Sequence, residues 1–346
     1  MRKQSTPTRG GCSFGRMQIE SRRRAGVILT TLSLSILSGC SLKGMALNAV
    51  ANSLSGGGSG VFLTDDDPVL VGEALPTNLK LMESVLQETP AHEGLLVATA
   101  SGFVMYAHGW VLRSARALES TNLAAGRRER ERAKRLFLRA RGYAGRALEL
   151  RHPGVTRALS GDPGGATSRL TREDLPAMYW YAAALGSALS ADKNDMQLLA
   201  DLPVVTAILE RSLTLDEGWN RGAAHELMMV VSASQPTGAG GGPAVAEGHF
   251  RRAVQLNDGA TVGIFVSFAE TVCVQRQDRE VFLRYLDQAL AFDPDLQPDT
   301  RLANLIAQEH ARWLLTRVDE LFIQDPEEAE SGLLLHGGLF PWPVER

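Results

Sequence analysis

The apolar residues of this chain recur at helical spacing from about Val61 onward, and this spacing constrains the fold more than any other feature. In the segment 127–150, small and apolar residues fall on one face of a helix. They are Ala133, Phe137, Ala140, Ala144, Ala147 and Leu148. No run of residues alternates apolar and polar positions with β-branched enrichment, the pattern that predicts strands. The sequence therefore predicts an all-α fold.

Capping residues and prolines predict where individual helices begin. Asp65-Asp66-Asp67-Pro68 combines an acidic N-cap with a proline in the first turn, and Pro76 predicts that the helix restarts there. Thr171 with Asp174 resembles a capping box. Further helices are expected over residues 92–119, 127–150, 176–190, 203–215, 219–233, 244–256, 264–275, 279–292 and 298–322.

A repeated spacing of small and apolar residues suggests how these helices are arranged. Phe282, Leu286, Ala289 and Pro294 have the spacing of the last helix of a tetratricopeptide repeat, in which alanine permits close helix contact and proline ends the helix. Looser copies occur at Ala246, Phe250 and Ala253, at Ala140, Ala144 and Ala147, and at Leu209, Ser212 and Leu213. The sequence predicts a superhelical array of about four degenerate repeat pairs with flanking helices. An irregular helical bundle is the alternative, since small residues at this spacing are also ordinary packing.

The N-terminal segment has the features of a lipoprotein signal. Three arginines at 22–24 precede an apolar run over 25–37 that is too short for a membrane span. The run ends in Leu37-Ser38-Gly39-Cys40, the pattern of a lipobox, so we expect cleavage before Cys40 and a lipid anchor on its thiol. An ordinary secretory signal with an incidental cysteine is the alternative. The residue after Cys40 is Ser41 and not aspartate, which favours export to the outer membrane. We therefore expect a periplasmic protein anchored in the inner leaflet of the outer membrane.

These features divide the chain into four parts. We expect a signal peptide over 1–39, with Met17 as an alternative start, and a lipidated tether rich in glycine and serine over 40–60. A helical domain over 61–325 and a tail over 326–346 follow. Removal of the signal peptide takes away seven basic side chains and one acidic one, so the remaining chain is more acidic than the full-length net charge of −3. A nucleic-acid partner is therefore not expected.

The sequence lacks a complete motif for catalysis or metal binding. The segment His225-Glu226-Leu227-Met228-Met229 begins like a zincin helix, but Met229 occupies the place of the second histidine. The glycine run 238–242 is not followed by the Gly-Lys-Ser/Thr of a phosphate-binding loop. Cys273 lies in an apolar stretch, where a buried and unreactive thiol is expected. We therefore expect no metal, no cofactor and no enzymatic activity.

Two sets of side chains are candidate binding residues. Arg135 and Arg139 lie four residues apart in a strongly basic segment, and we expect them to attract an acidic partner surface. A solvated helix face is the alternative. Tyr179, Trp180 and Tyr181 form a dense aromatic group, for which core packing is the alternative. Because three successive helical positions span roughly 200° of the helix circumference, we expect at least one of these rings to contact an apolar ligand.

Taken in order, several segments resemble the T component associated with TRAP transporters. They are Asp65-Asp66-Asp67-Pro68, the segments 74–76 and 79–83, the segment 133–140, Tyr179-Trp180, His249-Phe250, Leu302-Ala303-Asn304 and the segment 311–315. This resemblance implies a periplasmic lipoprotein of degenerate tetratricopeptide repeats that binds the solute-binding protein of a TRAP importer.

Two further expectations accompany the resemblance. We expect the protein to hold or pass an apolar or amphiphilic ligand, and we consider a homo-oligomer such as a trimer. A general repeat scaffold at the outer membrane, such as a pilotin or an assembly lipoprotein, is the alternative function. An enzyme whose site the sequence conceals is a third class.

Overall fold

The computed structural model describes residues 47–56 and 58–323, and this part of the chain contains helices and no strand. The all-α prediction is confirmed. The described residues from Ala51 to Ile323 belong to one compact unit that contains the hydrophobic cores, and the description below concerns this unit alone.

The α-helices after residue 57 are α2 (Gly58–Leu63), α3 (Pro68–Glu88), α4 (Glu93–Tyr106), α5 (Arg113–Glu119), α6 (Leu123–Arg151), α7 (Val155–Gly161), α8 (Pro163–Thr167), α9 (Leu175–Ala191), α10 (Met196–Ala200), α11 (Leu202–Asp216), α12 (Ala223–Ser234), α13 (Pro243–Asn257), α14 (Gly263–Phe268), α15 (Val274–Arg276), α16 (Arg279–Ala291), α17 (Arg301–Leu315) and α18 (Val318–Leu321).

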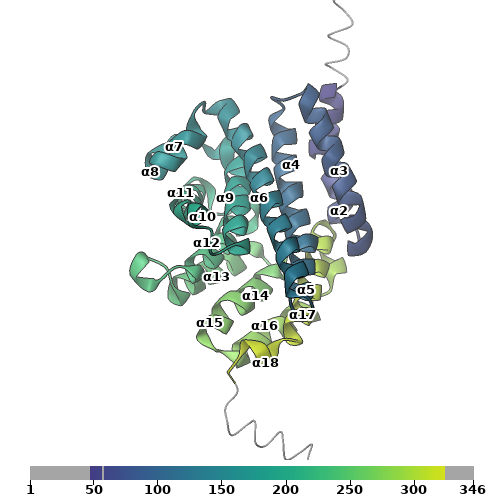
Figure 1. Ribbon diagram of the computed structural model, residues 1–346, viewed down its shortest axis with the longest axis vertical. Helices are drawn as coiled ribbons and strands as arrows, with labels where there is room; N and C mark the ends of the chain where they lie inside the picture. Colours follow the sequence, from purple (N-terminus) through teal and green to yellow (C-terminus); the bar gives the residue numbers. More distant parts are fainter. Residues whose placement is uncertain (1–46, 57, 324–346) are drawn as a thin grey trace, which may run out of the picture. The chain divides into compact units, whose positions relative to one another are not determined.

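The first core lies among the long N-terminal helices. Helices α3, α4, α6 and α9 lie side by side, each in contact with the next, and α11 packs on α9 (Figure 1). The small-residue face of α6 is buried in this core as the sequence predicts, with Phe137 and Ala140 completely buried. Alanines on this face allow α6 to contact both α4 and α9 closely, so their spacing positions the centre of the bundle.

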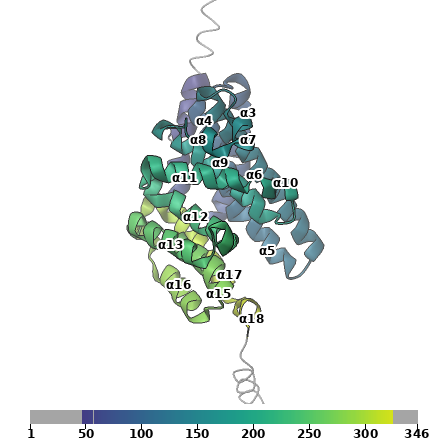
Figure 2. The same ribbon diagram turned by 90° about the vertical axis from the view of Figure 1, so that its left-hand side faces the viewer.

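The second core lies among the C-terminal helices. Helices α12 and α13 pack together beneath α11 (Figure 2), and α14, α16 and α17 follow in contact with one another. Phe250, Phe268 and Phe282 are buried in this core. The repeat-like residues are buried in the two cores. A repeat array and an irregular bundle would each bury them, so the tetratricopeptide arrangement stays a prediction.

Several helix boundaries differ from the sequence-based expectations. Helix α3 continues through Pro76, because its apolar face packs on α4 and compensates for the missing backbone hydrogen bond. Asn220 and Arg221 have positive φ angles of 46° and 57°, which delays the start of α12 to Ala223. The range 298–322 is interrupted after Leu315, and the short helices α7, α8 and α10 were not expected.

Part of the segment expected to be an unordered tether is helical. Residues 51–56 are helical and α2 begins at Gly58. Ala51 is completely buried in the first core, and Leu54 packs against it. The spacing of three residues between these side chains favours a helix that buries one face. The helical unit therefore begins before the expected boundary at residue 61.

Two helical stretches contain a π-helical segment. The segment η1 (Ala107–Leu112) joins α4 to α5, and η5 (Ala269–Cys273) joins α14 to α15. Such segments are rare and often mark functional sites. The continuous stretch Glu93–Glu119 is also long and apolar enough to cross a membrane, with a mean hydropathy of 1.5, but 61% of that window is buried in the structure. A buried core helix has the same composition.

Candidate functional site

A cavity of about 810 Å³ lies within the unit, between α3 and α4 on one side and α14 and α17 on the other. Its walls are mainly apolar and include Leu79, Met82, Val97, Val266 and Ile306. Small-molecule sites commonly have volumes of about 300–1,000 Å³ and apolar walls with few polar groups. The cavity is therefore a candidate ligand site.

Small residues along α4 and η1 leave the room that forms this cavity. Gly94, Ala98, Gly102 and Gly109 all lie on its wall. A Cβ atom on Gly102 would lie 2.7 Å from Cδ2 of Leu79, so the glycine permits α3 to pack closely on α4. Small side chains on this face thus combine close helix packing with open space.

One end of the cavity carries a cluster of charged and polar side chains. Glu270 of η5 lies 3.2 Å from Nη1 of Arg116 on α5 and 2.9 Å from Nε2 of His310 on α17. Burial alone would raise the pKa of Glu270, but the hydrogen bond with His310 and the charge of Arg116 lower this pKa to about 2. Glu270 is therefore ionised, and it joins three segments that are distant in the sequence.

His108 of η1 also lies on the cavity wall at this end. Its side chain is exposed at this wall, and many protein atoms surround it. Burial and the nearby Arg116 charge lower the pKa of His108 to about 4. Within the described part of the chain, its ring makes no hydrogen bond to another residue. His108 thus presents a neutral imidazole to the cavity.

A second acid lies on a different wall. Glu226 of α12 lines the cavity and accepts a hydrogen bond from Ser267 of α14. Burial raises the pKa of Glu226 to about 6 despite this hydrogen bond. No cation pairs with Glu226 among the described residues. Of these two cavity acids, Glu270 is therefore fully ionised, and Glu226 titrates near neutral pH.

A smaller cavity of about 570 Å³ shares part of its wall with the first. The shared residues include Trp110, Arg113 and Arg116. The indole nitrogen of Trp110 donates to the carbonyl oxygen of Pro68 at 2.9 Å, and Arg113 pairs with Glu309 at 2.5 Å. These contacts fix the side chains that separate the two cavities.

The basic residues of α6 are used mainly in contacts between helices. Arg139 lies 2.5 Å from the buried Glu83 of α3 and over the ring of Phe103. Arg135 is 64% exposed, and its one ion-pair contact among the described residues is a longer one of 3.8 Å with Glu131 of the same helix. Lys134 lies 2.8 Å from Asp192. Of the two arginines predicted to bind a partner, Arg139 is therefore used in a contact between helices and Arg135 is largely exposed. Partner binding stays a prediction for both.

The aromatic group lies outside both cavity walls. Tyr181 is buried in the first core, and Trp180 packs against the same core. Tyr179 contacts Trp180 and Trp219, with ring centroids 5.0 Å and 5.3 Å apart, and its pKa is raised by burial and by Glu226. None of the three residues lines either cavity. The expected ligand contact therefore finds no support in these cavities, and it stays a prediction.

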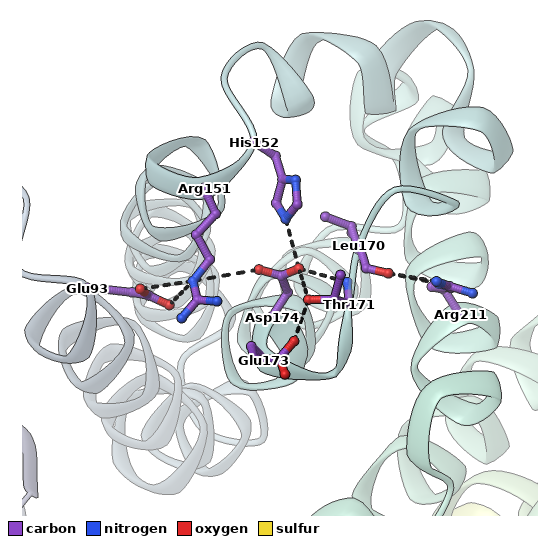
Figure 3. A network of polar contacts seen from close by, with 8 residues as sticks. All are labelled: Glu93, Arg151, His152, Leu170, Thr171, Glu173, Asp174 and Arg211. Atoms are coloured by element: carbon purple, nitrogen blue, oxygen red, sulfur yellow. Dashed lines mark hydrogen bonds and ion pairs between the residues drawn. The ribbon is translucent and has the colours of Figure 1, made fainter.

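A buried network around Asp174 positions the start of α9 (Figure 3). Asp174 accepts hydrogen bonds from the backbone of Thr171 at 2.8 Å and contacts His152 at 2.8 Å, which confirms the predicted capping box. The hydroxyl of Thr171 bonds to Asp174, whereas a catalytic triad requires the hydroxyl to bond to the histidine. We interpret this network as a structural contact between the end of α6 and the start of α9.

Other residues singled out in the sequence have structural surroundings. His225 contacts His249, with their Nδ1 atoms 2.9 Å apart. Burial raises the pKa of Cys273 to about 12, so its thiol stays protonated. Among the described residues, no group of three or more potential ligands is arranged to hold a metal ion. Cys40 and the tail 326–346 lie outside the described residues, and their predicted roles stay predictions.

Sequence reasoning missed the residues that form the polar end of the cavity. These are His108, Arg116, Glu270 and His310. The available signal was the presence of single ionisable residues, such as His108 and Glu270, within strongly apolar helical segments. A charge in such a segment is costly unless it is paired or faces a cavity.

Within the described residues, the fold and the cavity define an all-helical protein with a predominantly apolar cavity. Residues 64–322 match the sequence model of the TRAP transporter T-component family, so the chain belongs to this family. A protein of Treponema pallidum (strain Nichols), described as an "Uncharacterized protein", is 30% identical over 308 residues. The match covers 84% of this chain and 95% of the relative. Family membership associates the chain with TRAP transport as an accessory component.

Proposed function

We propose that this protein binds the solute-binding component of a TRAP-type importer and holds an apolar or amphiphilic ligand in its large cavity. The observation that carries the ligand proposal is the 810 Å³ cavity with apolar walls and one polar end. Apolar walls contribute binding free energy as they lose contact with water, and a few polar groups fix the orientation of a ligand.

Binding without chemical conversion is the function that this site supports best. Glu270 is paired with Arg116 and His310, and the pKa of Cys273 is raised. An activated nucleophile requires an adjacent base and usually a third group that orients the base. Among the described cavity residues, Ser267 donates to Glu226, but no third group is hydrogen-bonded to this pair to orient it.

The proposed location is the periplasm, with a lipid on Cys40 that anchors the protein to the inner leaflet of the outer membrane. This proposal rests on the lipobox at 37–40 and on Ser41. The anchor is tested by palmitate labelling of a Cys40→Ser variant, which should abolish the label. Unchanged labelling of this variant would remove the anchor from the proposal.

Partner binding is tested with a form of the chain that begins after Cys40. This form retains the whole compact unit from Ala51 onward. In sedimentation velocity, a mixture with the solute-binding protein encoded beside it should give a faster species than either protein alone. The protein alone should reveal any homo-oligomer such as a trimer. Independent sedimentation, together with enrichment of a secretin or barrel protein from membranes, would favour the scaffold alternative.

A further inference from the structure

We propose that the large cavity selects single-chain carboxylate amphiphiles, whose head group is bound by Arg116 and His108 at the polar end. This inference rests on the proposed ligand-holding function and specifies the class of ligand. It depends on the hydrogen-bonding groups that the protein leaves open to the cavity.

Arg116 provides the principal donors for an anionic head group. Its guanidinium has donors on three nitrogen atoms, and Nη1 lies near both Glu270 and His310. Nε and Nη2 have no partner among the described residues. The residue lines both cavities and its side chain is 19% exposed. The open donors of Arg116 therefore suit a carboxylate, which accepts two parallel hydrogen bonds from a guanidinium.

His108 adds a donor beside Arg116. Both residues line the cavity, and the Arg116 charge contributes to the lowered pKa of His108. A neutral imidazole can donate one hydrogen bond to a carboxylate, and a nearby anion favours uptake of a second proton. The polar end thus combines a permanent cation with a group that becomes cationic when an anion binds.

The polar end does not offer an equivalent site for a cationic head group. Glu270, the acid at this end, is already compensated by Arg116 and His310, and Glu93, elsewhere on the wall, is compensated by Arg151. Glu226 lies on α12, apart from this cluster, and accepts a hydrogen bond from Ser267 of α14. The hydrogen-bonding capacity left open at the polar end consists mainly of donors, which favours an acceptor.

The apolar wall defines the rest of the ligand. From Val97 to His108 the cavity follows α4 and η1, a helical distance of roughly 16 Å at about 1.5 Å per residue. Leu79 and Met82 of α3 and Ile306 of α17 line the same cavity. A largely apolar cavity that ends at donors accommodates an alkyl chain with a terminal carboxylate.

This arrangement makes binding dependent on pH. His108 faces Arg116, Glu270 and His310, and its pKa is about 4 without a ligand. A bound carboxylate raises this pKa, so binding is accompanied by proton uptake and strengthens as pH falls. Protonation of Glu226, whose pKa is about 6, removes a negative charge from the same cavity and acts in the same direction. The affinity should therefore rise between about pH 8 and about pH 6, where a fatty carboxylate stays ionised.

The test compares dodecanoate, dodecanol and dodecylamine by isothermal titration calorimetry, with the chain that begins after Cys40. Dodecanoate should bind more tightly than the other two. Arg116→Gln should weaken dodecanoate binding at least about tenfold, because it removes hydrogen bonds to a charged group, and should leave dodecanol binding unchanged. Arg128→Gln is the matched control, since Arg128 is exposed on α6.

Two further variants keep the test valid if Arg116→Gln disturbs the fold. The double variant Arg116→Gln with Glu270→Gln removes both charges of the ion pair and should show the same selective loss. His108→Gln breaks no ion pair and should reduce the pH dependence of dodecanoate binding.

Three results would overturn the inference. If dodecylamine binds more tightly than dodecanoate, or if Arg116→Gln and the double variant affect dodecanol as much as dodecanoate, the head-group assignment is wrong and the apolar ligand proposal stands. If none of the three compounds binds, the ligand-holding function fails as well.

Discussion

Helix α6 and the stretch from α4 to α5 cross the same core but use their residues differently. On α6, the small and apolar side chains of one face are buried, and many of the charged ones form ion pairs with residues in or next to neighbouring helices. On α4 and η1, small residues border open space, and the ring of His108 has no ion-pair partner within the part of the chain that the structure describes. The comparison distinguishes a helix that stabilises the fold from one that maintains a site.

Substitution of a buried residue on α6 should have the largest effect on the free energy of unfolding. Phe137 is completely buried on α6, so Phe137→Ala should lower the free energy of unfolding by about 3–5 kcal/mol. Ile306, which lines the cavity, has less contact to lose, and Ile306→Ala should cost less than about 2 kcal/mol. Urea denaturation of both variants measures the difference. Equal losses would contradict the distinction between packed and cavity-lining positions.

Trp180→Ala should give the next largest effect. Trp180 packs against the first core and is absent from both cavity walls, so we expect a loss of about 3 kcal/mol in unfolding free energy. Dodecanoate binding should stay unchanged at temperatures where the variant is folded. Weaker binding with unchanged stability would restore Trp180 as a ligand contact.

The titration of His108 should produce a smaller effect that depends on pH. Its pKa is about 4 in the folded protein against 6.5 as the usual value. The unfolded chain therefore binds more protons between these values, and the free energy of unfolding should fall as pH decreases from about 6.5 to about 4. His108→Gln should make this pH dependence shallower, as measured by urea denaturation across the range. His225 and His249, with lowered pKa values, contribute in the same direction and remain in the variant.

The smallest effects should separate the two arginines of α6. Arg139→Ala removes a partner of the buried Glu83 and should cost about 1 kcal/mol, whereas Arg135→Ala should change stability by less than about 0.5 kcal/mol. Arg135→Glu should slow association with the solute-binding protein most strongly at low salt, measured by surface plasmon resonance. Unchanged kinetics at low salt would leave Arg135 without a role in the encounter.

The sequence predicts the parts of this structure that depend on neighbouring residues. The buried face of α6 follows from the spacing of Phe137 and its neighbours, and the caps at Asp67 and Thr171 follow from side chains that bond to nearby backbone groups. These features can be predicted without knowing which distant segments of the chain come into contact.

The cavity depends on contacts that the sequence does not reveal. Arg116 and Glu270 meet only after α4, α14 and α17 have packed, and the open space depends on which small residues lack a facing side chain. The π-helical segments add a change of helical phase that α-helical periodicity does not predict. The ligand role of the aromatic group at 179–181 stays a prediction, because a dense group of aromatic residues occurs both in cores and in binding sites.

The π-helical segment η1 also has an evolutionary consequence. A π turn accommodates one more residue than an α turn, while Gly102 before it and Arg113 after it keep their separate contacts. Loss of one residue within 107–112 would let α4 and α5 join as a regular α-helix without altering those contacts. The same loss would rotate His108 by up to about 100°. Relatives that are one residue shorter at this point would therefore be expected to have diverged in the ligand they accept while retaining the fold.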